Sequence, residues 1–216
     1  MFEIRNILDS ILDTVLPRRE RRTRTETRSL DEISLSPASH ELLGVRILTL
    51  MEYREPATKD LIRSLKYDRS GHAVGLCAAL LADYLREEFA SVRAFSKKHI
   101  LLVPVPLHKN RLRERGFNQI EAVLRTLPIE FQDGALSHTE TEALVRTRDT
   151  APQTKLPRVE RLTNVSGAFA ANDLVIRDSH IYLIDDVVTT GATLVEAAKP
   201  LIENDALVTL MALARA

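Results

Sequence analysis

Apolar runs and helix-spaced apolar positions alternate along most of this chain. Three short runs have the continuous apolar character of buried parallel strands, and we expect them to be central in one sheet. Residues 42–53 are apolar but mixed, so their pattern favours a strand without excluding a helix. The three runs are residues 99–105, 181–184 and 206–211.

Segments with helical spacing lie between these runs. Residues 58–67 and 72–90 place their apolar side chains on one side of a predicted helix, and residues 194–199 follow the second strand as another helix. Strands that alternate with helices are typical of a parallel sheet. The pattern therefore predicts an α/β fold with a parallel sheet flanked by helices on both faces.

The N-terminal part of the chain has a different pattern. Residues 2–16 predict an amphipathic helix that ends at Pro17 and packs on protein, and they form a small helical appendage. Residues 18–28 hold six arginines without apolar periodicity, which predicts an exposed linker running to about residue 40. A contact strip for nucleic-acid phosphates is the alternative. We therefore divide the chain into an N-terminal helix and Arg-rich linker, 1–40, and a main domain, 41–216.

Composition limits the class of protein. Among 216 residues, 30 basic side chains balance 30 acidic ones, which argues against a polyanion-binding surface over the whole molecule. The single cysteine, Cys77, excludes an internal disulfide framework and lies in an apolar run, so we expect a buried structural thiol. No apolar run approaches the ~18 residues that span a bilayer, and no signal pattern begins the chain. We expect a cytoplasmic protein without membrane insertion.

The polar residues after the run 181–184 predict a sugar-phosphate site. Asp185 and Asp186 end the run, and a turn rich in Thr leads into the next helix. Backbone N–H groups and the helix dipole bind phosphate at such a turn, while the carboxylates suit a ribose diol or a hydrated Mg²⁺ bridging to phosphate. An ordinary turn in which Asp and Thr cap the helix is the alternative. The residues expected at the phosphate are Val188, Thr189, Thr190, Gly191, Ala192 and Thr193.

A basic stretch follows the predicted strand 99–105. Open α/β sheets bind ligands at the carboxyl ends of their strands, and cations there suit a diphosphate. A basic surface turn that leads into a helix is the alternative. The cations of this stretch are Lys109, Arg111, Arg113 and Arg115.

A polar segment with two prolines lies later in the chain. It contains Arg146, Arg148 and Gln153, with Pro152 and Pro157 close by. Such a segment suits a flexible loop that closes over a charged ligand and excludes water. A plain connector is the alternative.

The stretch 181–193 resembles the phosphoribosyl-pyrophosphate (PRPP) signature of type I phosphoribosyltransferases: an apolar strand, Asp-Asp, two apolar residues and Thr-Thr-Gly-Ala-Thr. Further strings make the chain, from roughly residue 53 to 215, similar to the ComF family (competence protein F). The fold implied is type I phosphoribosyltransferase-like. The strings are Leu-Lys-Tyr at 65–67, Val-Pro-Val-Pro-Leu at 103–107, Arg-Glu-Arg-Gly-Phe-Asn-Gln at 113–119 and Arg-Leu-Thr-Asn-Val-Ser-Gly-Ala-Phe at 161–169.

The resemblance implies a protein that binds PRPP with Mg²⁺ and transfers its ribose 5-phosphate to a nucleophile. Asp185 and Asp186 would hold the ribose diol and, indirectly, the Mg²⁺. A diphosphate loop would be formed by Leu107, His108, Lys109 and Arg111. The family is associated with DNA uptake in natural transformation, which implies single-stranded DNA or a DNA-uptake helicase as a partner. The alternative is a module without catalysis that senses PRPP or a nucleotide, or docks to such a partner.

One departure from the family concerns zinc. Family members usually carry a four-cysteine zinc module after an N-terminal helix that ends in proline. In this chain the arginine-rich residues 18–28 stand at that place, without cysteines. Because zinc needs thiolate or clustered histidine ligands, we expect no zinc module.

Overall fold

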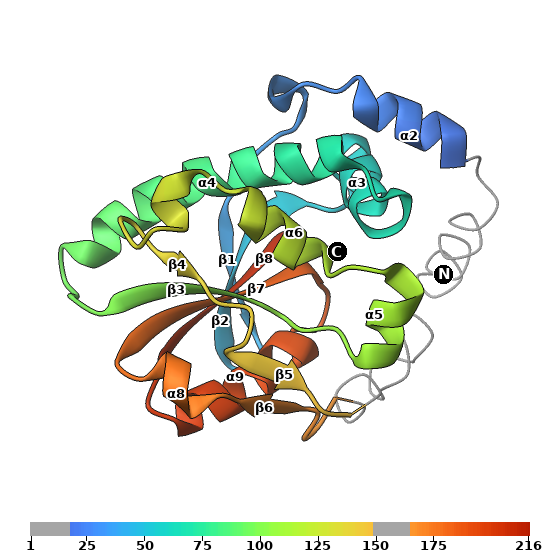
Figure 1. The fold of residues 1–216 in the computed structure, drawn as a ribbon. Coiled ribbons are helices and arrows are strands. Elements are labelled where there is room, and N and C mark those ends of the chain that lie inside the picture. The colour runs from blue at the N-terminus through green and yellow to red at the C-terminus, as the bar shows by residue number, and fades with distance from the viewer. Residues whose placement is uncertain (1–17, 149–164) are drawn as a thin grey trace.

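A mostly parallel sheet forms the centre of the molecule in the computed structural model, which describes residues 18–148 and 165–216. The six strands follow the order β1-β2-β8-β7-β3-β4, and only the pair β1–β2 is antiparallel (Figure 1). The α/β fold class is therefore confirmed, and the three predicted strands are the central ones. The strands are β1 (Ala38–Leu42), β2 (Val45–Glu52), β3 (His99–Pro104), β4 (His138–Thr139), β7 (Ser179–Val188) and β8 (Leu207–Arg215).

Helices cover both faces of this sheet (Figure 1). On one side lie α3 (Pro56–Arg63), α4 (Gly71–Arg93) and α6 (Gln119–Thr126). On the other lie α8 (Asp173–Ile176), α9 (Ala192–Glu203) and a two-stranded ribbon of β5 (Leu144–Arg146) and β6 (Phe169–Ala171). None of the helices in the described ranges has the length and apolar character to cross a membrane. The remaining elements are α2 (Arg18–Glu26), α5 (Lys109–Arg115) and the short η1 (Leu30–Glu32), η2 (Ser64–Asp68) and η3 (Ile129–Phe131).

Strand β7 shows how the two faces share the core. Tyr182 and Ile184 pack into the cluster beneath α4, whereas Ile181 and Leu183 pack into the cluster beneath α9. Successive strand residues point to opposite faces, so a continuous apolar run supplies both cores. The strand continues beyond the predicted run, through the two aspartates to Val188, because its pairing with β8 continues to Arg215.

The expectation of an exposed linker is wrong for Arg18–Glu26, which forms helix α2. This helix contacts α3 and η2 through polar side chains. Arg21 is buried and donates to both carboxylate oxygens of Asp68, at 3.0 and 2.6 Å. Hydrophobic periodicity does not reveal a helix that packs through ion pairs. The predicted division of the chain at residue 40 falls within strand β1.

The single cysteine lies inside α4. Cys77 is fully buried, and burial, followed by the charge of Asp186, raises the pKa of its thiol to about 12. A thiol that stays protonated in an apolar core is inert, so the prediction of a structural cysteine is confirmed.

Candidate functional site: the carboxyl end of β7

The turn after β7 favours a glycine. Gly191 has φ of +81° and is the N-cap of α9. A Cβ atom there would lie 2.9 Å from Ile47 Cδ1 and 3.2 Å from Leu42 Cβ. A side chain here would strain the turn, because the left-handed backbone favours glycine and the β1–β2 hairpin approaches closely.

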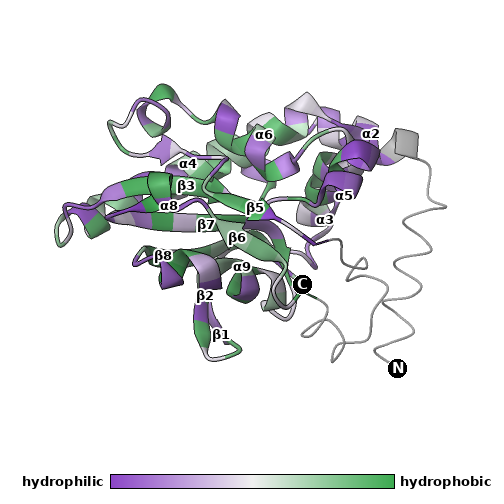
Figure 2. Ribbon diagram, turned by 60° about the horizontal axis from the view of Figure 1, so that its bottom comes forward, coloured by the Kyte–Doolittle hydropathy of each residue, from purple (hydrophilic) through white to green (hydrophobic). Residues whose placement is uncertain are grey.

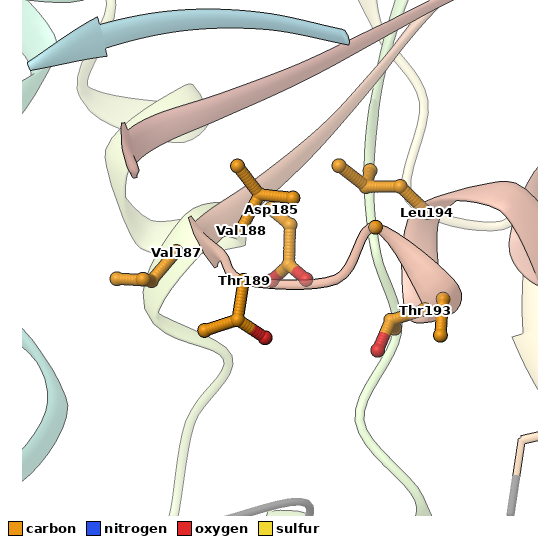
Figure 3. A pocket seen from close by; sticks show the side chains of 8 residues that line it. Asp185, Val187, Val188, Thr189, Thr193 and Leu194 are labelled. Carbon is orange, nitrogen blue, oxygen red and sulfur yellow. The ribbon is translucent and has the colours of Figure 1, made fainter. Parts of the chain in front are cut away.

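This turn lines an open cleft whose empty space, which includes part of the solvent at its mouth, is about 200 Å³ (Figure 3). Figure 3 shows the hydroxyls of Thr189 and Thr193 directed to the same side of the turn, with the Asp185 carboxylate close behind it. The predicted Thr190 does not line the cleft: it is buried, and its hydroxyl accepts from Ala192 N–H at 3.4 Å. The lining residues are Asp185, Val187, Val188, Thr189, Gly191, Ala192, Thr193 and Leu194.

The cleft has the donors that a phosphate needs. Helix α9 begins at Ala192 and runs to Glu203, so the positive end of its dipole lies at the turn. Backbone N–H groups of a first helical turn and threonine hydroxyls are donors of the kind found in phosphate sites. Five of the six residues expected at the phosphate therefore lie together around one cleft.

Asp185 is the acidic group of the cleft. One of its oxygens accepts from the Asp186 backbone N–H at 2.8 Å. Burial, followed by the neighbouring charge of Asp186, raises the pKa of Asp185 to about 7. The hydrogen bond from the Asp186 backbone, followed by the charges of Lys66 and Arg146, opposes this rise. A carboxyl that is costly to ionise in the free protein gains from a ligand that brings hydroxyl donors or a cation.

Asp186 leaves the strand toward the opposite face. Its Oδ1 forms an ion pair with Lys66 Nζ at 2.8 Å, and its Oδ2 accepts a short hydrogen bond from Gln119 Nε2. Burial would raise the pKa of Asp186, but the Lys66 ammonium and the Gln119 amide outweigh it and lower that pKa. Both oxygens of Asp186 are thus occupied by protein groups, so its expected contact with a ribose diol stays a prediction.

Lys66 and Gln119 had no predicted role, yet each lies in a string that carries the family resemblance. Lys66 is held on η2, a π-helical turn that follows α3. Gln119 begins α6 and also accepts from Arg115 at 3.2 Å, while the Arg115 guanidinium lies 5.8 Å from the Tyr67 ring centre. The strings at 65–67 and 113–119 therefore converge on Asp186. The family resemblance of these two strings could have pointed to Lys66 and Gln119 as functional residues, although it did not show what they contact.

The rest of the string 113–119 sets the direction of α6. Gly116 ends α5 with φ of +81°, and an added Cβ would come within 2.5 Å of the Arg69 guanidinium, which donates to Arg115 O. Asn118 caps α6 by accepting from Ile120 N–H at 3.0 Å, and it donates to Val105 O at 3.0 Å. These contacts orient α6 so that its first residue, Gln119, reaches Asp186.

The predicted diphosphate loop leaves β3 beside the aspartates. Val105 N–H donates to Ile184 O at 2.9 Å, so both chains reach the same edge of the sheet. The chain continues from β3 to β4 on one side of the sheet, and from β7 to β8 on the other. The carboxyl ends of β3 and β7 therefore flank a topological switch point, the place where open α/β sheets bind ligands. His108 caps α5 by accepting from Asn110 N–H at 3.3 Å, so Lys109 and Arg111 lie on a helix.

The predicted closing loop is described only at its ends. Arg146 lies on β5 with its guanidinium 5.2 Å from the Phe169 ring centre, and Arg148 donates to Ser166 O. Gly167 N–H in turn donates to Glu196 of α9 at 2.7 Å. Gln153 lies outside the described residues. The part of the segment that is described thus packs against the helix that begins at the cleft.

Groups of three or more His, Cys, Asp or Glu side chains that could hold a metal ion are absent from residues 18–148 and 165–216. The residues at the cleft still suit indirect contact with Mg²⁺, because the Asp185 carboxylate faces the cleft beside the turn. Carboxylates commonly hold Mg²⁺ together with water and phosphate oxygens.

A helix-flanked, mostly parallel sheet with an Asp-Asp strand and a Thr-Gly turn at its carboxyl edge defines a type I phosphoribosyltransferase-like fold. No family model matches the chain. Over 198 residues it is 31% identical to the DNA utilization protein YhgH of Escherichia coli (strain K12), covering 86% of this chain and 83% of that protein. The chain therefore belongs to the ComF family.

Two further relatives support this assignment. The chain is 33% identical over 128 residues to the competence protein ComFC of Bacillus subtilis (strain 168), which covers 58% of this chain and 49% of that protein. It is 29% identical over 164 residues to the ComFC of Streptococcus pneumoniae (strain ATCC BAA-255 / R6), covering 76% of this chain and 64% of the relative.

Proposed function

We propose that this protein binds PRPP together with Mg²⁺ and acts as a phosphoribosyltransferase. The observation that carries the proposal is the cleft in which the turn 188–193 and the Asp185 carboxylate lie side by side. A phosphate and a diol on one small molecule match these two features. PRPP adds a diphosphate, for which the cations after β3 are suited.

In this proposal the 5-phosphate accepts from the backbone N–H groups of the turn and from the threonine hydroxyls. Asp185 accepts from the ribose hydroxyls, and residues 107–111 contact the diphosphate. The bond between C1 of the ribose and the diphosphate oxygen breaks as C1 bonds to the acceptor, which loses a proton, and diphosphate leaves. Holding PRPP in place and stabilising the developing charge supply most of the rate in such a transfer.

Mg²⁺, when bound with PRPP, would neutralise part of the diphosphate charge and assist its departure. Asp185 is the residue that would contact its water shell. Asp186 reaches the ligand in this proposal only if the bonds to Lys66 and Gln119 rearrange.

The names of the relatives suggest the biological setting. One is called a DNA utilization protein and two are called competence proteins. We propose that this chain serves the same general purpose, in the uptake or use of DNA. Its acceptor would then be a compound encountered in that process.

Calorimetry with PRPP and Mg²⁺ tests ligand binding. We expect saturable heat with PRPP, and competition by ribose 5-phosphate and by diphosphate separately, because each covers part of the site. Thr189→Val should weaken PRPP binding about tenfold, the effect of losing a hydrogen bond to a charged group. Thr126→Val, at an exposed position near the end of α6, is the matched control and should leave the affinity unchanged. Absence of heat at millimolar PRPP would refute the proposal.

Diphosphate release in the presence of candidate acceptors tests turnover separately. Binding without release from any acceptor would favour the alternative, a module that senses PRPP without catalysis.

Contact with single-stranded DNA is a second candidate function. The exposed side chains of Lys109 and Arg113 on α5, with exposed Arg69 beside that helix, motivate it. An electrophoretic shift of single-stranded DNA should weaken steeply as salt rises, because phosphate contacts release counterions. A shift that salt does not change, or no shift, would count against this function.

A further inference from the structure

Helix α2 lies next to the turn that carries Lys66, and both lie toward the same side of the molecule as α5 (Figures 1 and 2). Figure 2 shows that α2 is largely hydrophilic, so apolar burial does not explain its position. Its contacts with η2 are polar. The Arg21–Asp68 ion pair leaves only 8% and 3% of the two side chains exposed.

A chain of hydrogen bonds connects α2 with both ends of η2. Thr25 and Ser64 share a buried hydrogen bond of 2.9 Å, and Ser64 donates to Asp68 at 3.1 Å. Arg21 completes the connection at Asp68. Ser64 and Asp68 are the first and last residues of η2, and Lys66 stands between them. The π-helical turn is thereby fixed on each side of Lys66.

Lys66 matters to the cleft because of charge. Two adjacent carboxylates next to an anionic ligand repel it, and Lys66 balances the charge of one of them from 2.8 Å. Without this ammonium, Asp186 would be a buried charge with only an amide partner, and Asp185 would be harder to ionise. The location of η2 therefore affects an anion bound on the other face of β7.

We propose that helix α2 is a positioning element for the site: through the Arg21–Asp68 ion pair it fixes η2 so that Lys66 stays on Asp186. Arg21 does not touch the ligand in this arrangement and acts through Lys66. The inference rests on the proposed PRPP site for its effect on affinity, whereas its effect on η2 does not depend on any ligand.

Arg21→Ala and Arg24→Ala form a matched pair for the test. Both remove one guanidinium from α2, but Arg24 pairs at 3.0 Å with Asp60 of α3, with 56% of its own side chain exposed. We expect Arg21→Ala to weaken PRPP binding about tenfold, within the usual range of coupling between separate groups, and Arg24→Ala to weaken it less than about twofold. Equal effects of the two variants would overturn the proposal.

A double-mutant cycle distinguishes positioning from general damage. In a Lys66→Met background, Arg21→Ala should cause little further loss of PRPP affinity, because Lys66 transmits its effect. Additive losses would overturn the proposal. Asp68→Asn, which keeps the shape of the side chain, takes the place of Arg21→Ala if that variant does not fold, with the same expected results.

Hydrogen exchange in the free protein completes the test. Peptides that cover residues 64–69 should exchange faster in Arg21→Ala than in wild type, and at the wild-type rate in Arg24→Ala. Unchanged exchange in Arg21→Ala would overturn the proposal. If wild type gives no heat with PRPP, the proposed function fails while this readout still decides the role of α2.

Discussion

Asp185 and Asp186 are neighbours on β7, and the surroundings of their side chains differ in almost every respect. Asp185 faces an open cleft with a phosphate-type turn, and its pKa is raised. Asp186 faces α6 and η2, is bound by Lys66 and Gln119, and has a lowered pKa. One strand can therefore direct one carboxylate into an open cleft and use the next to hold the surrounding elements together.

The largest expected effect comes from breaking the Asp186 side. Lys66→Met leaves a buried carboxylate without its ion-pair partner and should lower the free energy of unfolding by roughly 3 kcal/mol. Denaturant titration at pH 7 measures it. Lys199→Met, which removes an exposed lysine paired with Glu196 on α9, is the control and should cost less than about 1 kcal/mol. Equal losses would mean that the Asp186 pair is no more important than a surface pair.

An effect of similar size is expected at the turn on the Asp185 side. Gly191→Ala combines a strained backbone with the contact to Ile47, and should lower stability by about 3 kcal/mol and abolish PRPP binding. Gly134→Ala is the control, since Gly134 has φ of +90° but nothing within 4 Å of an added Cβ. It should cost about 1 kcal/mol, from backbone strain alone. Thermal unfolding of both variants would show whether close packing adds to strain at Gly191.

A pH series separates the two carboxyls. The folded-state pKa of Asp185, about 7, lies above its ordinary unfolded value, so the folded protein holds this proton more tightly. Its contribution therefore lowers stability progressively as pH rises from about 4 to 7. Asp185→Asn should match wild type near pH 4 and be more stable at pH 7, by on the order of 2 kcal/mol after allowance for solvent screening.

Asp186 should give the opposite sign. Its folded-state pKa is lowered, so its contribution is present above the unfolded pKa and is lost as pH falls through the folded value. Asp186→Asn should therefore lose stability at pH 7 and approach wild type in strong acid. Parallel pH profiles of the two Asn variants would contradict the contrast between the carboxyls.

The smallest effect is expected at the outer end of the Asp186 network. Tyr67 is 46% exposed beneath the Arg115 guanidinium. Tyr67→Ala should lower the free energy of unfolding by about 0.5 kcal/mol, the value of an exposed cation–π contact. Denaturant titration measures it, and a loss above 2 kcal/mol would show that the network extends to this surface.

The sequence alone predicted the elements whose causes are local. Continuous apolar runs predicted the central strands, and Asp-Asp followed by a Thr-Gly turn predicted the place where residues gather around the cleft. The need for glycine at 191 is partly local, since a left-handed φ suits no other residue as well. Only the fold showed that the β1–β2 hairpin closes the remaining space there.

The tertiary structure decided which carboxylate faces the cleft and which is bound by protein groups. Lys66 and Gln119 lie far from Asp186 along the chain, and nothing in the spacing of residues states that η2 and α6 meet above β7. Helix α2 was not predicted for the same reason. Its partners are polar side chains that lie far from it in the sequence and come close only in the folded chain. Local propensity and hydrophobic periodicity show which face of a segment will be buried. Ion pairs between segments depend instead on how the whole chain folds.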